Sequence, residues 1–144
     1  LKADPAIVFE AIKAPWFVRR SSTISVSIGS AFQYAADSFK SDPTVVREAV
    51  KNDGRAFMYA TDVVKADRTI VLEAIKTWSP ALQYAPDDVR ADPAVVLAAV
   101  RKDGRVLEFA ADDLRADRTI VLEAIKTWAP ALQYAPSDVR ADPA

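Results

Sequence analysis

Cysteine and histidine are both absent from the 144 residues, and the only 3 glycines stand at positions 29, 54 and 104. Without them the chain offers no disulfide, no thiolate or imidazole zinc site, no cysteine nucleophile and no histidine general base. Glycines this far apart form neither a GxGxxG fingerprint nor a phosphate-binding GxxxxGK[ST] loop. We therefore expect no catalytic site, no metal and no cofactor, and hence no enzyme activity.

The chain also lacks an excess of either charge and any long apolar run. Lysine and arginine number 19 against 20 acidic residues, so no global field favours nucleic acid or an anionic membrane. No apolar run approaches the roughly 20 residues of a transmembrane helix, and the first residues do not resemble a signal peptide. We expect a soluble protein without a nucleic-acid partner, intracellular or organellar rather than secreted, although the compartment itself stays open.

What the chain does contain is a repeat. The stretch Ala66–Arg90 returns at Ala116–Arg140 with two differences, Ser79/Ala129 and Asp87/Ser137. A fixed period of this kind is typical of a tandem array. The alignment predicts one repeat array over 1–144, with partial units at both ends, an insertion at 15–28 in the first full unit, and units at about 3–40, 41–65, 66–90, 91–115 and 116–140. Because both ends interrupt the pattern, we expect a segment of a longer protein or a processed product.

Each unit opens with a strong helix start. An Asp stands at the same position of every unit and is followed by Pro or Arg, as in Asp92-Pro93 and Asp67-Arg68. The Asp side chain can accept hydrogen bonds from the first helical turn, and Pro is tolerated at the first helical position. Ile70, Val71, Ala74 and Ile75 then follow at i, i+1, i+4 and i+5, a spacing that predicts one apolar stripe on an α-helix.

The helices end in two ways. Units 41–65 and 91–115 carry Asp-Gly at Gly54 and Gly104, and we call them Gly-turn units; here we expect the glycine to adopt the left-handed conformation. Units 66–90 and 116–140 carry Thr-Trp-Ser/Ala-Pro instead, and we call them Trp-turn units, since proline breaks the helix there.

A second, shorter helical piece follows each turn, for example ALQYA at 81–85, whose Leu82, Tyr84 and Ala85 can pack back on the first helix. An acidic turn closes the unit, with Asp87 as a helix cap and Val89 filling the seam between units. One hairpin cannot bury its apolar stripe alone, so neighbouring units must stack. The prediction is an all-α fold, an α-solenoid of short helix-turn-helix repeats of about 25 residues.

Candidate partner-binding residues are the tryptophans and two arginines. Trp78 and Trp128 occupy the same register two units apart, where they either form interface anchors along one edge or fold over the end of each hairpin. Trp16 stands at the start of the insertion, and Arg19 and Arg20 lie within it. Insertions in solenoids emerge as loops on one face, so this one is either a contact loop or a neutral insertion.

Recurrent charges have simpler explanations. Acids at the same register, at Asp62, Asp87/Asp88, Asp112/Asp113 and Asp138, indicate caps and solvated turns, because catalysis needs only one site. Glu10, Glu73 and Glu123 stand three residues before Lys13, Lys76 and Lys126, a spacing that predicts exposed ion pairs. The periodic arginines, Arg55, Arg90, Arg105, Arg115 and Arg140 with Arg19 and Arg20, are interpreted as a surface neutralised by neighbouring Asp rather than as a nucleic-acid site.

The unit ADPAVVLAAVRKDGRVLEFAADDLR at 91–115 resembles the tandem repeat catalogued as domain of unknown function 4116. The resemblance covers 31–144 and half a unit at 1–13, and it implies an array of short helical hairpins with no assigned activity. We expect a non-catalytic scaffold that binds protein partners, within or beside a larger complex. Two alternatives stay open: a targeting or regulatory region of an enzyme whose catalytic domain lies elsewhere, and a repeat-type RNA binder.

Overall fold

The computed structural model describes residues 32–141 together with Glu10. The insertion at 15–28 and the half unit at 1–13 therefore lie outside the described residues. Over 32–141 the chain is helical throughout and contains no strand. Its elements are α3 (Asp37–Lys40), α4 (Pro43–Asn52), η1 (Gly54–Tyr59), α5 (Asp62–Lys65), α6 (Arg68–Thr77), η2 (Ser79–Tyr84), α7 (Asp87–Arg90), α8 (Pro93–Lys102), η3 (Gly104–Phe109), α9 (Asp112–Arg115), α10 (Arg118–Thr127), η4 (Ala129–Tyr134) and α11 (Ser137–Ala141).

Every 25-residue unit repeats the same three elements, a ten-residue α-helix, a six-residue 3₁₀ helix and a short α-helix. The long helices begin where the sequence predicts. The Asp67 carboxylate accepts a hydrogen bond from the Thr69 N–H at 2.8 Å, and Asp92 accepts the same bond from Ala94 at 2.8 Å. These bonds satisfy backbone donors that the first turn would otherwise leave unpaired.

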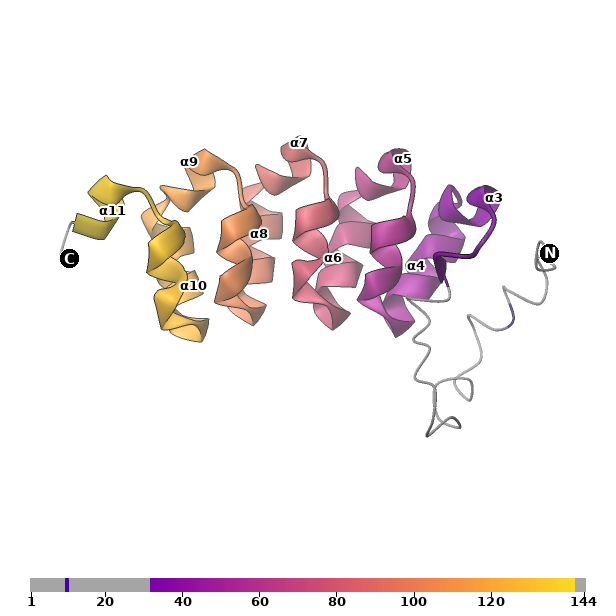
Figure 1. Cartoon of the computed structure of the whole chain (residues 1–144), viewed down its shortest axis with the longest axis horizontal. Coiled ribbons are helices and arrows are strands. Elements are labelled where there is room, and N and C mark those ends of the chain that lie inside the picture. Colours follow the sequence, from indigo (N-terminus) through magenta and orange to yellow (C-terminus); the bar gives the residue numbers. More distant parts are fainter. Residues whose placement is uncertain (1–9, 11–31, 142–144) are drawn as a thin grey trace, which may run out of the picture.

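The units stack side by side in one row (Figure 1). The long helices α4, α6, α8 and α10 lie next to one another in chain order, the 3₁₀ helices form a second layer behind them, and the short helices follow one edge. The predicted apolar stripe lies between the two layers: Ile70, Val71, Ala74 and Ile75 are all buried. The all-α repeat fold is confirmed, and its core runs continuously along the row because each unit buries its stripe against its neighbours.

The second helical piece is a 3₁₀ helix that packs back on the long helix as predicted. In η2, Leu82 is fully buried and the following Ala85 is nearly so, whereas Tyr84 is partly exposed. In α7, Val89 is fully buried and fills the seam between units. The cap predicted for Asp87 is wrong, since no side chain caps α7 and Asp87 instead pairs with Arg90 in solvent. This short helix is held by its buried valine and by packing rather than by a cap.

The prediction for the glycines is also wrong. Neither Gly54 nor Gly104 has a positive φ; each is the first residue of a 3₁₀ helix, and the chain turns at the extended Asp before it. Glycine is needed there for close approach. A Cβ on Gly54 would lie 2.4 Å from the Ala74 carbonyl oxygen and 2.7 Å from Thr77 Oγ1, both in the next unit.

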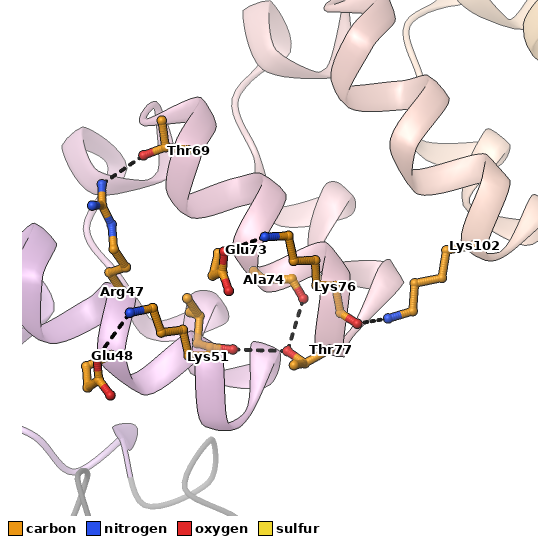
Figure 2. Close-up of polar contacts among 10 residues, drawn as sticks. Arg47, Glu48, Lys51, Thr69, Glu73, Ala74, Lys76, Thr77 and Lys102 are labelled. Atoms are coloured by element: carbon orange, nitrogen blue, oxygen red, sulfur yellow. Dashed lines mark hydrogen bonds and ion pairs between the residues drawn. The ribbon is translucent and has the colours of Figure 1, made fainter.

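That close approach defines the junction in which a Gly-turn unit is followed by a Trp-turn unit. Thr77 Oγ1 lies 3.0 Å from the Val50 carbonyl oxygen of the preceding unit and 3.3 Å from its own Ala74 carbonyl oxygen (Figure 2). Thr127 makes the same bond to Val100 at 2.9 Å, beside Gly104. The hydroxyl therefore ties two long helices together at the point where glycine lets them meet.

The junction in which a Trp-turn unit is followed by a Gly-turn unit is built differently. Lys102 Nζ reaches across from α8 to donate to the Lys76 carbonyl at the end of α6 (Figure 2). At the opposite edge the Ala111 N–H donates to the Arg90 carbonyl at 3.1 Å. The matching position of a Trp-turn unit is Pro86, which has no N–H, so that backbone bond cannot form at the other kind of junction. Two kinds of junction alternate, which gives the array a 50-residue structural period.

Candidate functional site

The two described tryptophans close the turn after the long helix of each Trp-turn unit. Trp78 and Trp128 have extended backbones, and their N–H groups still bond the Ala74 and Ala124 carbonyls at 2.8 and 2.9 Å. Both indoles are half-buried and pack against the core. Each ring packs against the core as the second interpretation predicted and keeps part of its surface in solvent, so an anchor role for the two tryptophans stays a prediction.

Each tryptophan contacts the ring of a tyrosine from the end of the following 3₁₀ helix, stacked in the first pair and tilted in the second. The centroids of Trp78 and Tyr84 are 5.7 Å apart, and those of Trp128 and Tyr134 are 5.9 Å apart. Such contacts between aromatic rings add about 0.5–1.5 kcal/mol beyond the buried area. The Arg105 guanidinium lies 5.8 Å from the Trp128 ring centroid, within the range of a cation–π contact. The exposed aromatic surface is therefore held in fixed orientation by its neighbours.

Tyr134 also interacts with the preceding unit through its hydroxyl. Burial, together with the nearby Glu108 carboxylate, raises the pKa of Tyr134 above its ordinary value. The phenol therefore stays protonated, and Glu108 serves as its hydrogen-bond partner. This contact joins η3 and η4 on the same side of the molecule as the tryptophan.

An aromatic row runs along the 3₁₀ layer. The fourth residue of each ALQYA-like segment is aromatic in every unit, and adjacent 3₁₀ helices contact one another from η1 to η4. Two members are exposed, Tyr34 at 81% and Tyr84 at 36%, and the others are half-buried. We call these residues the aromatic row: Tyr34, Tyr59, Tyr84, Phe109 and Tyr134. The prediction from the sequence for this position was packing only, although its repetition in every unit is the signal that could have found the row.

The remaining predicted residues fall in other places. Trp16, Arg19 and Arg20 lie outside the described residues. Arg90 and Arg115 pair with Asp87 and Asp112 on the short helices, so they lie on an edge away from Arg105 and form no single basic row with it. This finding supports a locally neutralised surface.

The predicted Glu–Lys pairs on the long helices are confirmed for two of the three positions. The Lys76 ammonium lies 2.8 Å from Glu73, and the Lys126 ammonium pairs with Glu123. Hydrogen bonds from these lysines lower the pKa of both carboxyls. The remaining pair includes Lys13, which lies outside the described residues.

The surface also carries shallow grooves between long helices. One of about 430 Å³ lies between α6 and α8 and is lined mainly by Leu72, Ile75, Lys76, Ala98 and Lys102. Leu72 is half-buried there, at the boundary between the two helices. Within 32–141, no three His, Cys, Asp or Glu side chains come together in a way that could hold a metal ion. No helix in that range is long and apolar enough to cross a membrane.

Comparison with known proteins agrees with the repeat period. The sequence pattern described as domain of unknown function 4116 matches residues 24–65, 67–115 and 92–140. The chain belongs to this family. No curated protein and no solved structure matches it. The matches at 67–115 and 92–140 each span two consecutive hairpins and start 25 residues apart, so the family pattern fits a pair of hairpins that begins with either kind of unit. The match at 24–65 includes part of the predicted insertion, so the family pattern extends further toward the N-terminus than the resemblance over 31–144 indicated.

Proposed function

We propose that the chain is a non-catalytic scaffold whose aromatic row, with Trp78 and Trp128, binds a protein partner. The observation that carries the proposal is the repeated display of partly exposed aromatic side chains on one layer of a stiff array. Tyr and Trp supply large contact areas at low entropic cost and are enriched at the energetic centres of protein interfaces.

The geometry favours an extended partner. One aromatic side chain recurs every 25 residues, so a partner segment that follows the 3₁₀ layer meets similar contacts in each unit. Four of the five residues of the row, all except Tyr34, lie in packed 3₁₀ helices, and the tryptophans are oriented by contact with tyrosine rings, which reduces the ordering cost of binding. Arg105, stacked on Trp128, adds a hydrogen-bond donor beside the aromatic surface.

The test is a quantitative pull-down from native extract with the wild-type chain and with Tyr34→Ser/Tyr84→Ser. These two side chains are the most exposed members of the row, so their loss should leave the fold intact. The matched control is Val63→Ser, which removes an apolar side chain that is 85% exposed on the short-helix edge, away from the row. Circular dichroism confirms that all three proteins are folded.

A partner retained by the wild type and by Val63→Ser but lost with the tyrosine variant supports the proposal. Partners that bind all three proteins equally would show that the aromatic row is not the binding face. Capture of single-stranded RNA with steep salt dependence would instead favour the repeat-type RNA binder, because stacking platforms combined with arginines also bind single strands.

A further inference from the structure

The two nearly identical Trp-turn units differ in what covers them. Unit 66–90 is followed by α8 and η3, whereas the corresponding face of unit 116–140 lies at the end of the described row (Figure 1). Leu82 is fully buried, but its counterpart Leu132 is 36% exposed. Val89 is fully buried, but Val139 is only half-buried. Since these residues are the same, the difference comes from the following unit, which covers unit 66–90 and has no counterpart after unit 116–140 among the described residues.

The uncovered surface forms one apolar hollow. It has a volume of about 280 Å³ and is lined by Leu122, Ile125, Leu132 and Val139, together with Val121 and two arginines. We call this surface the end face. Leu122 is 57% exposed there, while Leu72 at the same position is half-buried between α6 and α8. The end face is therefore a second copy of a surface whose covered form is visible inside the same molecule.

The covered form shows which features the neighbour supplies. Ala98 presents a small apolar side chain to the groove that contains Leu72. Lys102 donates to the Lys76 carbonyl, and the Ala111 N–H donates to the Arg90 carbonyl. The equivalent acceptors on the end face are the Lys126 and Arg140 carbonyls. The apolar contact from Ala98 and the two hydrogen bonds from Lys102 and Ala111 all come from a Gly-turn unit.

We propose that the end face is a docking surface that selects a helical repeat of the Gly-turn kind. This repeat is the one whose first four residues have the sequence of Ala141 to Ala144. These four residues, ADPA, repeat 91–94 letter for letter. The proposal follows from the junction geometry and stands whether or not the aromatic row binds protein.

A Trp-turn repeat is excluded by the same geometry. It would bring a glutamate where Ala98 stands, a proline without an N–H in place of Ala111, and a threonine in place of Lys102. At both described junctions the threonine of a Trp-turn unit and the carbonyl beside it meet a glycine, and a Cβ at Gly104 would lie 2.2 Å from the Ala124 carbonyl oxygen. The end face carries Ala129 at that position, so its Cβ blocks the approach.

The experiment extends the full chain after Ala144 with 21 residues of either kind. One extension repeats 95–115 and completes a Gly-turn unit, and the other repeats 70–90 and completes a Trp-turn unit. Thermal unfolding and hydrogen exchange of the α10 amides are measured for both, with the unextended chain as the reference. We expect the Gly-turn extension to raise the melting temperature and to slow α10 exchange at least about tenfold, and the Trp-turn extension to do neither.

Two variants make the test specific. Leu132→Asp alters a side chain that is already partly exposed, so the unextended protein should still fold, but the gain from the Gly-turn extension should be lost. Ala129→Gly should allow the Trp-turn extension to protect α10. Equal protection by both extensions in the wild-type background would overturn the proposed selectivity. An unextended chain that sediments as a dimer with α10 already protected would overturn it too, by showing that a second copy covers the end face.

Discussion

Replacement of Gly54 by alanine separates local preference from tertiary packing. Gly54 has no positive φ, so local propensity alone predicts that Gly54→Ala stabilises the protein by about 0.4–1 kcal/mol through the unfolded state. The structure predicts the opposite sign. The added Cβ would meet the Ala74 carbonyl oxygen at 2.4 Å, Thr77 Oγ1 at 2.7 Å and Trp78 Cβ at 2.8 Å.

Two of these three atoms cannot move out of the way as a flexible side chain could, since one belongs to the backbone and the other is a Cβ fixed to it. The two units must therefore separate by several tenths of an ångström, and overpacking of this kind costs about 1–3 kcal/mol. We expect a net loss that lowers the melting temperature by up to about 9 °C for a chain of this size.

The assay is thermal unfolding followed by far-ultraviolet circular dichroism. Ser79→Ala is the matched control, because Ser79 holds the same position in a Trp-turn unit and already has a Cβ, and it should change stability little. A double variant Gly54→Ala/Thr77→Ala should recover only part of the loss, since the Ala74 carbonyl remains in place. An unchanged or higher melting temperature for Gly54→Ala would refute the close-approach reasoning.

Three further predictions test the caps, the junctions and the charges. Asp67→Ala should cost about 0.5–2 kcal/mol of stability, because the Thr69 N–H loses its acceptor, and denaturant unfolding measures it. Leu72→Asp should lower the melting temperature more than Leu122→Asp, because the two residues share a sequence context and differ only in the neighbour that covers Leu72; equal effects would contradict the stacking of α6 on α8. A hydrogen bond from Thr69 lowers the pKa of Asp67, and one from Lys76 lowers the pKa of Glu73. The stability that these carboxylates contribute is therefore present above their unfolded pKa values and is lost as the pH falls through the folded values. The melting temperature, measured over a pH series, should decline below about pH 4, and a smaller decline in Asp67→Ala confirms the assignment.

Local signals in the sequence were sufficient for the fold class. A capping Asp followed by Pro or Arg, an apolar stripe at helical spacing and a strict 25-residue period each act within a few turns of chain, so Asp67 and Asp92 begin helices where predicted. The buried positions Ile70, Val71, Ala74 and Ile75 follow from the same periodicity. The Glu73–Lys76 pair also depends only on spacing along one helix.

Other features were decided only when units came together. The sequence around Gly54 is typical of a helix that ends in a left-handed glycine, yet Gly54 has no positive φ. Glycine is required there because a carbonyl of the next unit approaches it, and no local sequence pattern predicts that contact. Asp87 has the composition of a cap but points into solvent beside Arg90. The half-burial of Trp78 depends on Tyr84 and on the next layer of helices.

The sequence by itself determined that this chain is a helical array, because helix starts, stripes and repeat period are all short-range properties. Only the tertiary structure decided how the units meet: Thr77 bonds one neighbour beside Gly54, and Lys102 bonds the other at Lys76. Identical segments also have different surfaces, since Leu82 is buried and Leu132 is exposed. The physical reason is that burial and close approach belong to pairs of units, whereas propensity belongs to each residue in its own helix.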